Sequence, residues 1–135
     1  MRYQAKLSGP LLDRIDLHIE VPAMPAEELL QAAAGEPSAS VRQRVTLARQ
    51  RAIERQGSAN QHLQGRDIDA HSHLEDSAAQ FLQNAATRLG WSARATHRAI
   101  KVARTIADLA ASEAICTAHV AEAMQYRRAL RAAAS

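Results

Sequence analysis

SARATHRAIKVARTIADLA, residues 92–110, predicts an amphipathic helix around which the rest of the chain is organised. Ser92 is a favourable N-cap, because its hydroxyl accepts hydrogen bonds from the first free backbone N–H groups of a helix. At the helical pitch, one arc of roughly 120° gathers seven apolar side chains: Ala95, Ala99, Val102, Ala103, Ile106, Leu109 and Ala110. A second arc carries the charged residues: Arg94, Arg98, Lys101, Arg104 and Asp108. We therefore expect one packing face and one charged face, for which exposure to solvent is the simplest interpretation.

Arg94 does not fit that simple interpretation. It lies in the first turn of the helix, where the positive end of the helix dipole disfavours a cation. An arginine at this position is easier to explain if an anion lies nearby. The composition agrees, since 15 of the 17 basic residues are Arg, the side chain suited to bidentate contacts with phosphate or carboxylate. The 14 acidic residues reduce the net charge to +3.

The composition indicates one domain of closely packed helices. The chain has 135 residues, of which 47% are hydrophobic, yet it holds one Phe and one Trp, so Ala supplies much of the apolar content. Cys116 is the single cysteine, which rules out an internal disulfide framework and fits a reducing compartment. No apolar run approaches membrane-spanning length, and the N-terminal residues lack the apolar centre of a signal peptide. We expect a soluble cytoplasmic protein with no membrane partner.

Residues 15–21 predict the one convincing strand. Apolar Ile15, Leu17, Ile19 and Val21 alternate with polar residues up to Pro22, the pattern of a half-buried strand. A single strand has no hydrogen-bonding partners, and even an isolated hairpin is only marginally stable. We therefore expect the sheet to lie outside these residues, the chain to be a fragment, and residues 1–24 to be loosely packed.

Beyond Pro25 the hydrophobic period becomes helical. A short helix is expected to follow Pro25, and Ser40 with Gln43 forms a capping-box pattern for a helix over residues 38–56. Gly57 is the expected stop of that helix, because glycine readily adopts the left-handed conformation that ends helices. Residues 57–71 give no clear pattern beyond one helical turn at 60–63.

Two more helices complete the expected bundle. Ser72 with Glu75 forms a second capping-box pattern, for a helix that Gly90 ends. Only two residues separate this end from the Ser92 cap, so the two helices should form a helical hairpin. Thr117 is the expected N-cap of a last helix. The predicted fold is mainly α, a bundle of four or five helices.

The chain offers little chemistry of its own. Neither Lys6 nor Lys101 follows a glycine, so the glycine-rich loop that cradles ATP phosphates is absent. His71 and His73 do not share a helical face, and no third ligand is suitably spaced, so no metal site is expected. No Ser or Cys has a base at a recognisable spacing. This chain should be inactive as an enzyme by itself.

Three ordered blocks resemble a known family. SGPLLDRIDLHIEVP at 8–22, SARATHRAIKVARTIADL at 92–109 and HVAEAMQYR at 119–127 are similar to the C-terminal part of magnesium-chelatase-like AAA+ ATPases of the competence ComM/YifB group. The resemblance spans nearly the whole chain. The chain departs from the family at Ala52, where Gln is usual, and over most of 57–71.

The resemblance implies a domain division. Residues 1–24 would be the C-terminal end of a nucleotide-binding α/β core, with 15–21 as its last strand. Residues 25–135 would be the helical lid. The remainder of the core and the neighbouring subunits of a hexameric ring would be the partners of this chain.

The same resemblance assigns two site residues. Arg14, in Leu-Leu-Asp-Arg-Ile-Asp, matches the catalytic arginine finger that a ring ATPase presents to ATP on the neighbouring subunit. Arg94, in Ser-Ala-Arg-Ala, matches the sensor-2 arginine directed at the γ-phosphate. The full-length protein would use ATP and Mg²⁺ as a DNA motor, a helicase in branch migration during natural transformation, whereas this chain alone would hold no cofactor.

An autonomous nucleic-acid-binding module is the alternative. The arginines of 38–56 and the charged arc of 92–110 would then contact phosphates. Such a module should bind DNA by itself, with an affinity that falls steeply as salt rises. A helical adaptor for protein partners is a third, weaker possibility.

Overall fold

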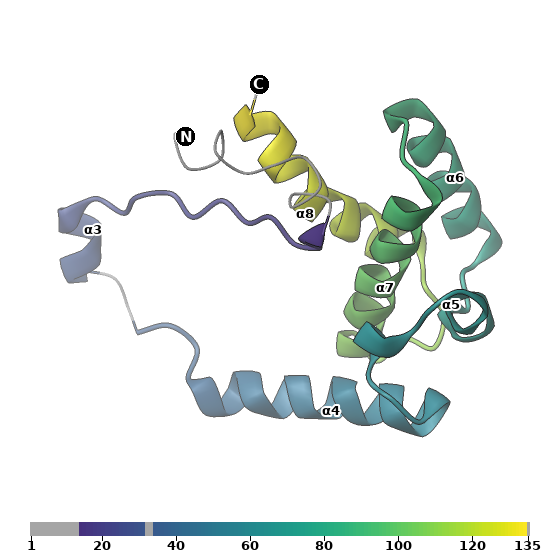
Figure 1. Ribbon diagram of the computed structural model, residues 1–135. Coiled ribbons are helices and arrows are strands. Elements are labelled where there is room, and N and C mark those ends of the chain that lie inside the picture. The colour runs from purple at the N-terminus through teal and green to yellow at the C-terminus, as the bar shows by residue number, and fades with distance from the viewer. Residues whose placement is uncertain (1–13, 32–33, 135) are drawn as a thin grey trace.

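The computed structural model describes residues 14–31 and 34–134, and nearly all of its regular structure is helical (Figure 1). The predicted mainly α fold is confirmed. The described elements follow in chain order: α3 (Ala26–Gln31), α4 (Ser38–Gln56), η1 (Asn60–His62), α5 (Arg66–Ser72), α6 (Asp76–Leu89), α7 (Ala93–Leu109) and α8 (Thr117–Ala134). No helix in these ranges is long and apolar enough to cross a membrane.

Helix α7 is the centre of the bundle. It packs against α4, α5, α8 and η1, while α6 packs against α8 (Figure 1). Small side chains make these close approaches possible, because Ala99, Ala103 and Ala107 are the buried alanines of α7. The rest of the core comes from Ile100 of α7, from α5, α6 and α8, and from the connections between elements: Leu63, Ile68, Ala78, Leu82, Ala85, Ile100, Ile115, Val120, Ala123 and Met124.

The ends of three helices lie where the sequence predicts them. The Ser92 hydroxyl accepts a hydrogen bond from the Ala95 N–H at 3.1 Å, so the N-cap of α7 is confirmed. Gly57 and Gly90 follow α4 and α6 with φ of 80° and 67°. A positive φ strains residues that carry a Cβ atom, which explains why glycine ends both helices.

Both predicted capping boxes are wrong. Helix α4 begins at Ser38, two residues before Ser40, and α6 begins at Asp76 with Glu75 at the N-cap position. Ser72 instead ends α5, and its carbonyl accepts a hydrogen bond from a buried arginine, Arg104. A capping pattern reflects only the hydrogen bonds that a few neighbouring residues can form. At Ser72, the contact from Arg104 on a distant helix takes precedence over that local preference.

The start of α8 differs from the prediction by one residue. Thr117 is the first helical residue, so Cys116 precedes the helix. The Cys116 N–H donates to Nδ1 of His119 at 3.0 Å. A side chain from the first turn thus satisfies a backbone donor at the helix start, which is the second half of a capping box.

The segment predicted as a strand, 15–21, is not paired as one in the described residues. Residues 15–25 have no regular secondary structure and lead across an open trace to α3 (Figure 1). The reason is the absence of a partner strand, since a strand is maintained by its ladder of hydrogen bonds. Among the residues that the structure describes, one backbone bond attaches the segment to the bundle, from the His18 N–H to the Tyr126 carbonyl at 2.9 Å. The rest of the predicted stub, residues 1–13, lies outside the described residues.

Candidate functional site

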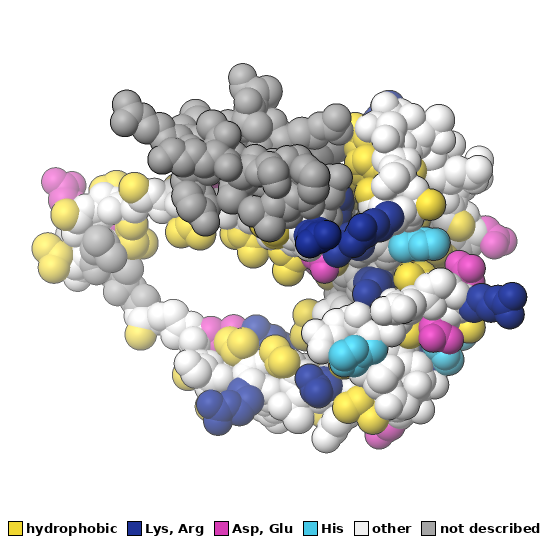
Figure 2. All heavy atoms as spheres, viewed as in Figure 1, with side chains coloured by type: hydrophobic (Ala, Val, Ile, Leu, Met, Phe, Trp, Pro, Cys, Tyr) yellow, Lys and Arg dark blue, Asp and Glu magenta, His cyan; other side chains and the backbone are white. Residues whose placement is uncertain are grey.

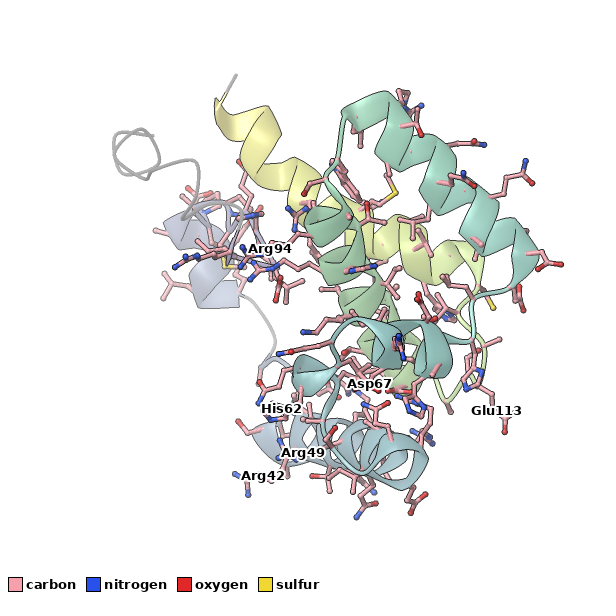
Figure 3. The ribbon with its side chains drawn as sticks, turned by 45° about the vertical axis from the view of Figure 1, so that its right-hand side comes forward. Arg42, Arg49, His62, Asp67, Arg94 and Glu113 are labelled. Atoms are coloured by element: carbon pink, nitrogen blue, oxygen red, sulfur yellow. The ribbon has the colours of Figure 1, made fainter. Side chains whose placement is uncertain are left out.

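Arg94 lies at the N-terminal end of α7, two residues after the Ser92 cap (Figure 3). Its side chain is exposed, and no hydrogen bond or ion pair engages it within the part of the chain that the structure describes. The first turn of a helix has backbone N–H groups without acceptors and a partial positive charge. The guanidinium therefore adds to a local field that favours an anion.

Arg98 lies one turn further along the same side of α7. Its Nη1 is 3.5 Å from Oδ1 of Asp16, in a pair whose side chains are 21% and 49% exposed respectively. Asp16 follows Arg14 by two residues, and Arg14 is exposed at the start of the described chain. The structure thus brings the segment that carries Arg14 against the helix that carries Arg94.

His18 attaches the same segment to α8. Its ring is partly buried, and the pKa of His18 lies below its ordinary value of 6.5 because burial, and secondly the Arg127 cation, disfavour protonation. Asp16 acts in the opposite direction. The guanidinium of Arg127 also lies over the Trp91 ring, 5.5 Å from its centroid. Residues 16 and 18 therefore join the segment to α7 and α8 close to the start of α7.

A buried polar cluster forms at the other end of α7, and the sequence analysis missed it. Arg104 and Asp108, expected on a charged, solvent-facing arc, are 0% and 1% exposed. Arg104 Nη1 donates to the carbonyls of Ser72 and Glu113 at 2.9 and 2.7 Å, and Nη2 donates to that of Ser112 at 2.7 Å. The prediction of a solvated charged face is wrong for this half of the helix.

Asp108 is the shared acceptor of this cluster. Its carboxylate receives both Nη1 and Nη2 of Arg55, at 2.8 and 3.2 Å, and Nδ2 of Asn60 at 2.9 Å. Arg104 Nη2 lies 3.2 Å from the same carboxylate. Burial lowers the pKa of Arg104, and Asp108 opposes that shift. The cluster joins α4, η1 and α7, and its role is structural because its members bond to one another. The buried Nε of Arg104 has no hydrogen-bond partner among the described residues.

A sequence signal for the cluster existed but was incomplete. Arg104 and Asp108 stand four residues apart, so they face each other along a helix. Nothing local, however, distinguishes a buried i,i+4 pair from an exposed one. The partners that make the burial of Asp108 tolerable, Asn60 and Arg55, lie 48 and 53 positions away in sequence.

Two family models match this chain. The family model described as magnesium chelatase, subunit ChlI C-terminal, matches residues 35–127, and the model described as magnesium chelatase, subunit ChlI, matches residues 1–29. The first match covers more than half of the chain. The chain belongs to the magnesium chelatase ChlI C-terminal family.

Similar proteins confirm the expected resemblance to the ComM/YifB group. The chain is 46% identical to the competence protein ComM of Haemophilus influenzae over 132 residues, 97% of this chain and 26% of that protein. It is 44% identical to the uncharacterized protein YifB of Salmonella typhimurium over 128 residues, 94% of this chain and 25% of YifB. The chain therefore spans about a quarter of the length of these relatives.

Several arginines of α4 are paired within the fold. On α4, Arg44 pairs with Glu36, Arg55 with Asp108, and Arg51 donates to the Asp108 carbonyl at 3.0 Å. Arg42 and Arg49 are exposed (Figure 3). Figure 2 shows the Lys and Arg side chains of one face as separate patches. Much of the positive charge on α4 is therefore already paired within the fold.

The histidines considered as a metal pair do not gather a ligand set. His71 is half-buried in α5, whereas His73 is exposed after it with a φ of 50°. Across residues 14–31 and 34–134, no three His, Cys, Asp or Glu side chains come together as potential metal ligands.

Proposed function

We propose that the chain forms the helical lid of an AAA+ ring ATPase, with Arg94 as its sensor-2 arginine and Arg14 as its arginine finger. The observation that carries the proposal is the exposed Arg94 guanidinium at the capped N-terminus of α7, the most extensively packed helix. A rigid helix fixed by the core can hold a cation at one defined place. The family resemblance of the Ser-Ala-Arg-Ala motif supports the same role.

Arg94 would act on the γ-phosphate of ATP. A guanidinium is planar and permanently charged, so it can neutralise the charge that spreads over the phosphoryl oxygens during transfer. The free N–H groups at the start of α7 would add to that attraction. Displacement of α7 as the phosphate leaves would then connect hydrolysis with movement of the lid.

Arg14 would act on the ATP bound by the neighbouring subunit. Its exposure is consistent with a side chain that reaches outside its own chain. In well-studied NTPases, a finger arginine accelerates hydrolysis by roughly 10³ to 10⁵. Arg14 and Arg94 would therefore serve different ATP molecules in the ring.

The remaining machinery would come from elsewhere in the full-length protein. Its core would bind ATP and Mg²⁺, and its subunits would form the hexameric ring. The name of the Haemophilus relative, a competence protein, supports a DNA motor that drives branch migration during natural transformation. A cytoplasmic location follows from these partners.

The decisive experiment measures ATP turnover of the full-length protein carrying Arg14→Ala or Arg94→Ala. We expect each variant to bind nucleotide and assemble, yet to lose turnover by about 10³-fold or more for the finger. Arg88→Ala, which removes an exposed arginine at the end of α6, is the matched control. Unchanged turnover with reduced DNA affinity would contradict both assignments and favour the basic-module alternative.

A further inference from the structure

The ion pair between Asp16 and Arg98 occupies a significant position in the fold. It joins the segment that carries Arg14 to the helix that carries Arg94, with 3.5 Å between Oδ1 of Asp16 and Nη1 of Arg98. Asp16 is two residues from one proposed site residue, and Arg98 is one helical turn from the other. A displacement of Asp16 or Arg98 would therefore reach Arg14 or Arg94 through a very short stretch of chain.

The exposure of the pair speaks against a role in stability. About half of the Asp16 side chain is open to solvent, and ion pairs of this kind contribute little to the free energy of folding. At the other end of the helix, the buried cluster of Arg104 and Asp108 already fixes α7 within the bundle. An ion pair is instead suited to fixing orientation, because it constrains two charged groups relative to each other.

A second contact restricts how the segment can turn about that pair. The His18 N–H donates to the Tyr126 carbonyl of α8 at 2.9 Å. Two attachments two residues apart define the direction of a chain segment as well as its position. Because these contacts attach the segment to α7 and α8, they also restrict the position of Arg14, two residues before Asp16.

From this geometry we propose that Asp16 and Arg98 are positioning residues that couple the Arg94 helix to the Arg14 segment. The inference rests on the proposed function and deepens it. A movement of α7 that accompanies a change at Arg94 would displace Arg98, and Asp16 would carry the displacement to Arg14. The lid of one subunit would thus control the finger that the same subunit offers to its neighbour.

The test is a charge-exchange cycle in the full-length protein. Asp16→Asn and Arg98→Gln should each lower kcat by roughly ten- to a hundredfold, the range expected when a reacting group is misplaced, while the KM for ATP changes less than about twofold because neither group binds nucleotide. The losses in the double variant should be clearly less than additive, since the two changes share the interaction between Asp16 and Arg98. The exchange Asp16→Arg with Arg98→Asp should restore most of the lost turnover, which a merely structural role for either residue would not predict.

Matched controls are available in the same elements. Glu20→Gln removes another exposed acid from the segment, and Arg88→Gln removes an exposed arginine from α6; both should leave turnover unchanged. Additive losses in the double variant, absence of rescue by the exchange, or full activity of both single variants would each overturn the coupling.

Failure of the coupling can be distinguished from failure of the proposed function. Arg14→Ala and Arg94→Ala are measured alongside. If these two abolish turnover while the Asp16 and Arg98 variants retain it, the site assignments stand and the coupling is wrong. If Arg14→Ala and Arg94→Ala retain turnover, the proposed function fails and the coupling fails with it.

Discussion

The buried Arg104 side chain holds the end of α5 and the α7 to α8 connection together. Its guanidinium binds the carbonyl of Ser72 at the end of α5 and the carbonyls of Ser112 and Glu113 within the α7 to α8 connection. Arginine suits this place, because its planar group offers several donors in fixed directions and retains its charge. A buried cation of this kind is tolerated only because the carbonyls and Asp108 surround it.

Replacing Arg104 with Met should destabilise the chain strongly. Arg104→Met keeps a long apolar stem but removes the donors of three carbonyls and one partner of Asp108, so the free energy of unfolding should fall by about 3 kcal/mol or more. Urea unfolding measures the change. Arg88→Met, at an exposed site, should stay within about 0.5 kcal/mol of the wild type. Equal stability of the two variants would show that the buried cluster is not needed.

At the scale of elements, α7 has two different charged ends. Near its start, Arg94 is exposed and Arg98 is only partly buried, whereas near its end Arg104 and Asp108 are fully enclosed. The amphipathic pattern located the apolar residues correctly in part: Ala99 and Ala103 are buried, but Leu109 is 45% exposed. The two ends of α7 differ because α4 and η1 cover the charged side of its C-terminal half.

The attachment of segment 15–21 to α8 should weaken in acid. The folded-state pKa of His18 is lowered, so the detached form takes up a proton more readily than the attached form. The attachment is therefore at full strength above pH 6.5, the ordinary pKa of the ring, and is lost as the pH falls through the lowered value.

Hydrogen exchange at the His18 amide measures this loss. The protection factor, corrected for the intrinsic exchange rate, should decrease between about pH 8 and about pH 5.5. His18→Gln retains the amide and removes the titration, so its protection should be independent of pH over the same range. A pH-dependent decrease of equal size in that variant would assign the effect to another group.

On the scale of the whole molecule, the N-terminal segment exposes an apolar stripe. Ile15, Leu17, Ile19 and Val21 are 36%, 47%, 67% and 84% exposed. These residues are the alternating set from which the strand was predicted. The proposed function explains the exposure, because the sheet that would cover this stripe belongs to the rest of the ATPase core.

Polar substitutions in this stripe should act differently in two contexts. Ile19→Ser and Val21→Ser should change the free energy of unfolding of this chain by less than about 0.5 kcal/mol each. In the full-length protein each should cost about 1.5–3 kcal/mol, the value for burying such a side chain. Denaturant titrations compare the two. Leu82→Ser, in the core, should destabilise both forms, and a large loss from Val21→Ser in this chain would contradict the domain division.

The paired arginines lead to a prediction about DNA binding. Because several α4 arginines are occupied within the fold, this chain should bind duplex DNA no more tightly than about 10⁻⁴ M at physiological salt, the weak end of non-specific binding. Fluorescence anisotropy over a salt series measures this. Arg42→Ala with Arg49→Ala tests the exposed pair on α4. Submicromolar binding that those changes abolish would favour the nucleic-acid-binding module.

The sequence by itself determined the helical class, the family, the Ser92 cap and the glycine ends of α4 and α6, because each depends on a pattern within a short stretch of chain. Only the tertiary structure decided that Arg104 and Asp108 are buried, that Ser72 ends a helix and that Asp16 meets Arg98. Each of these depends on groups brought together from distant parts of the sequence.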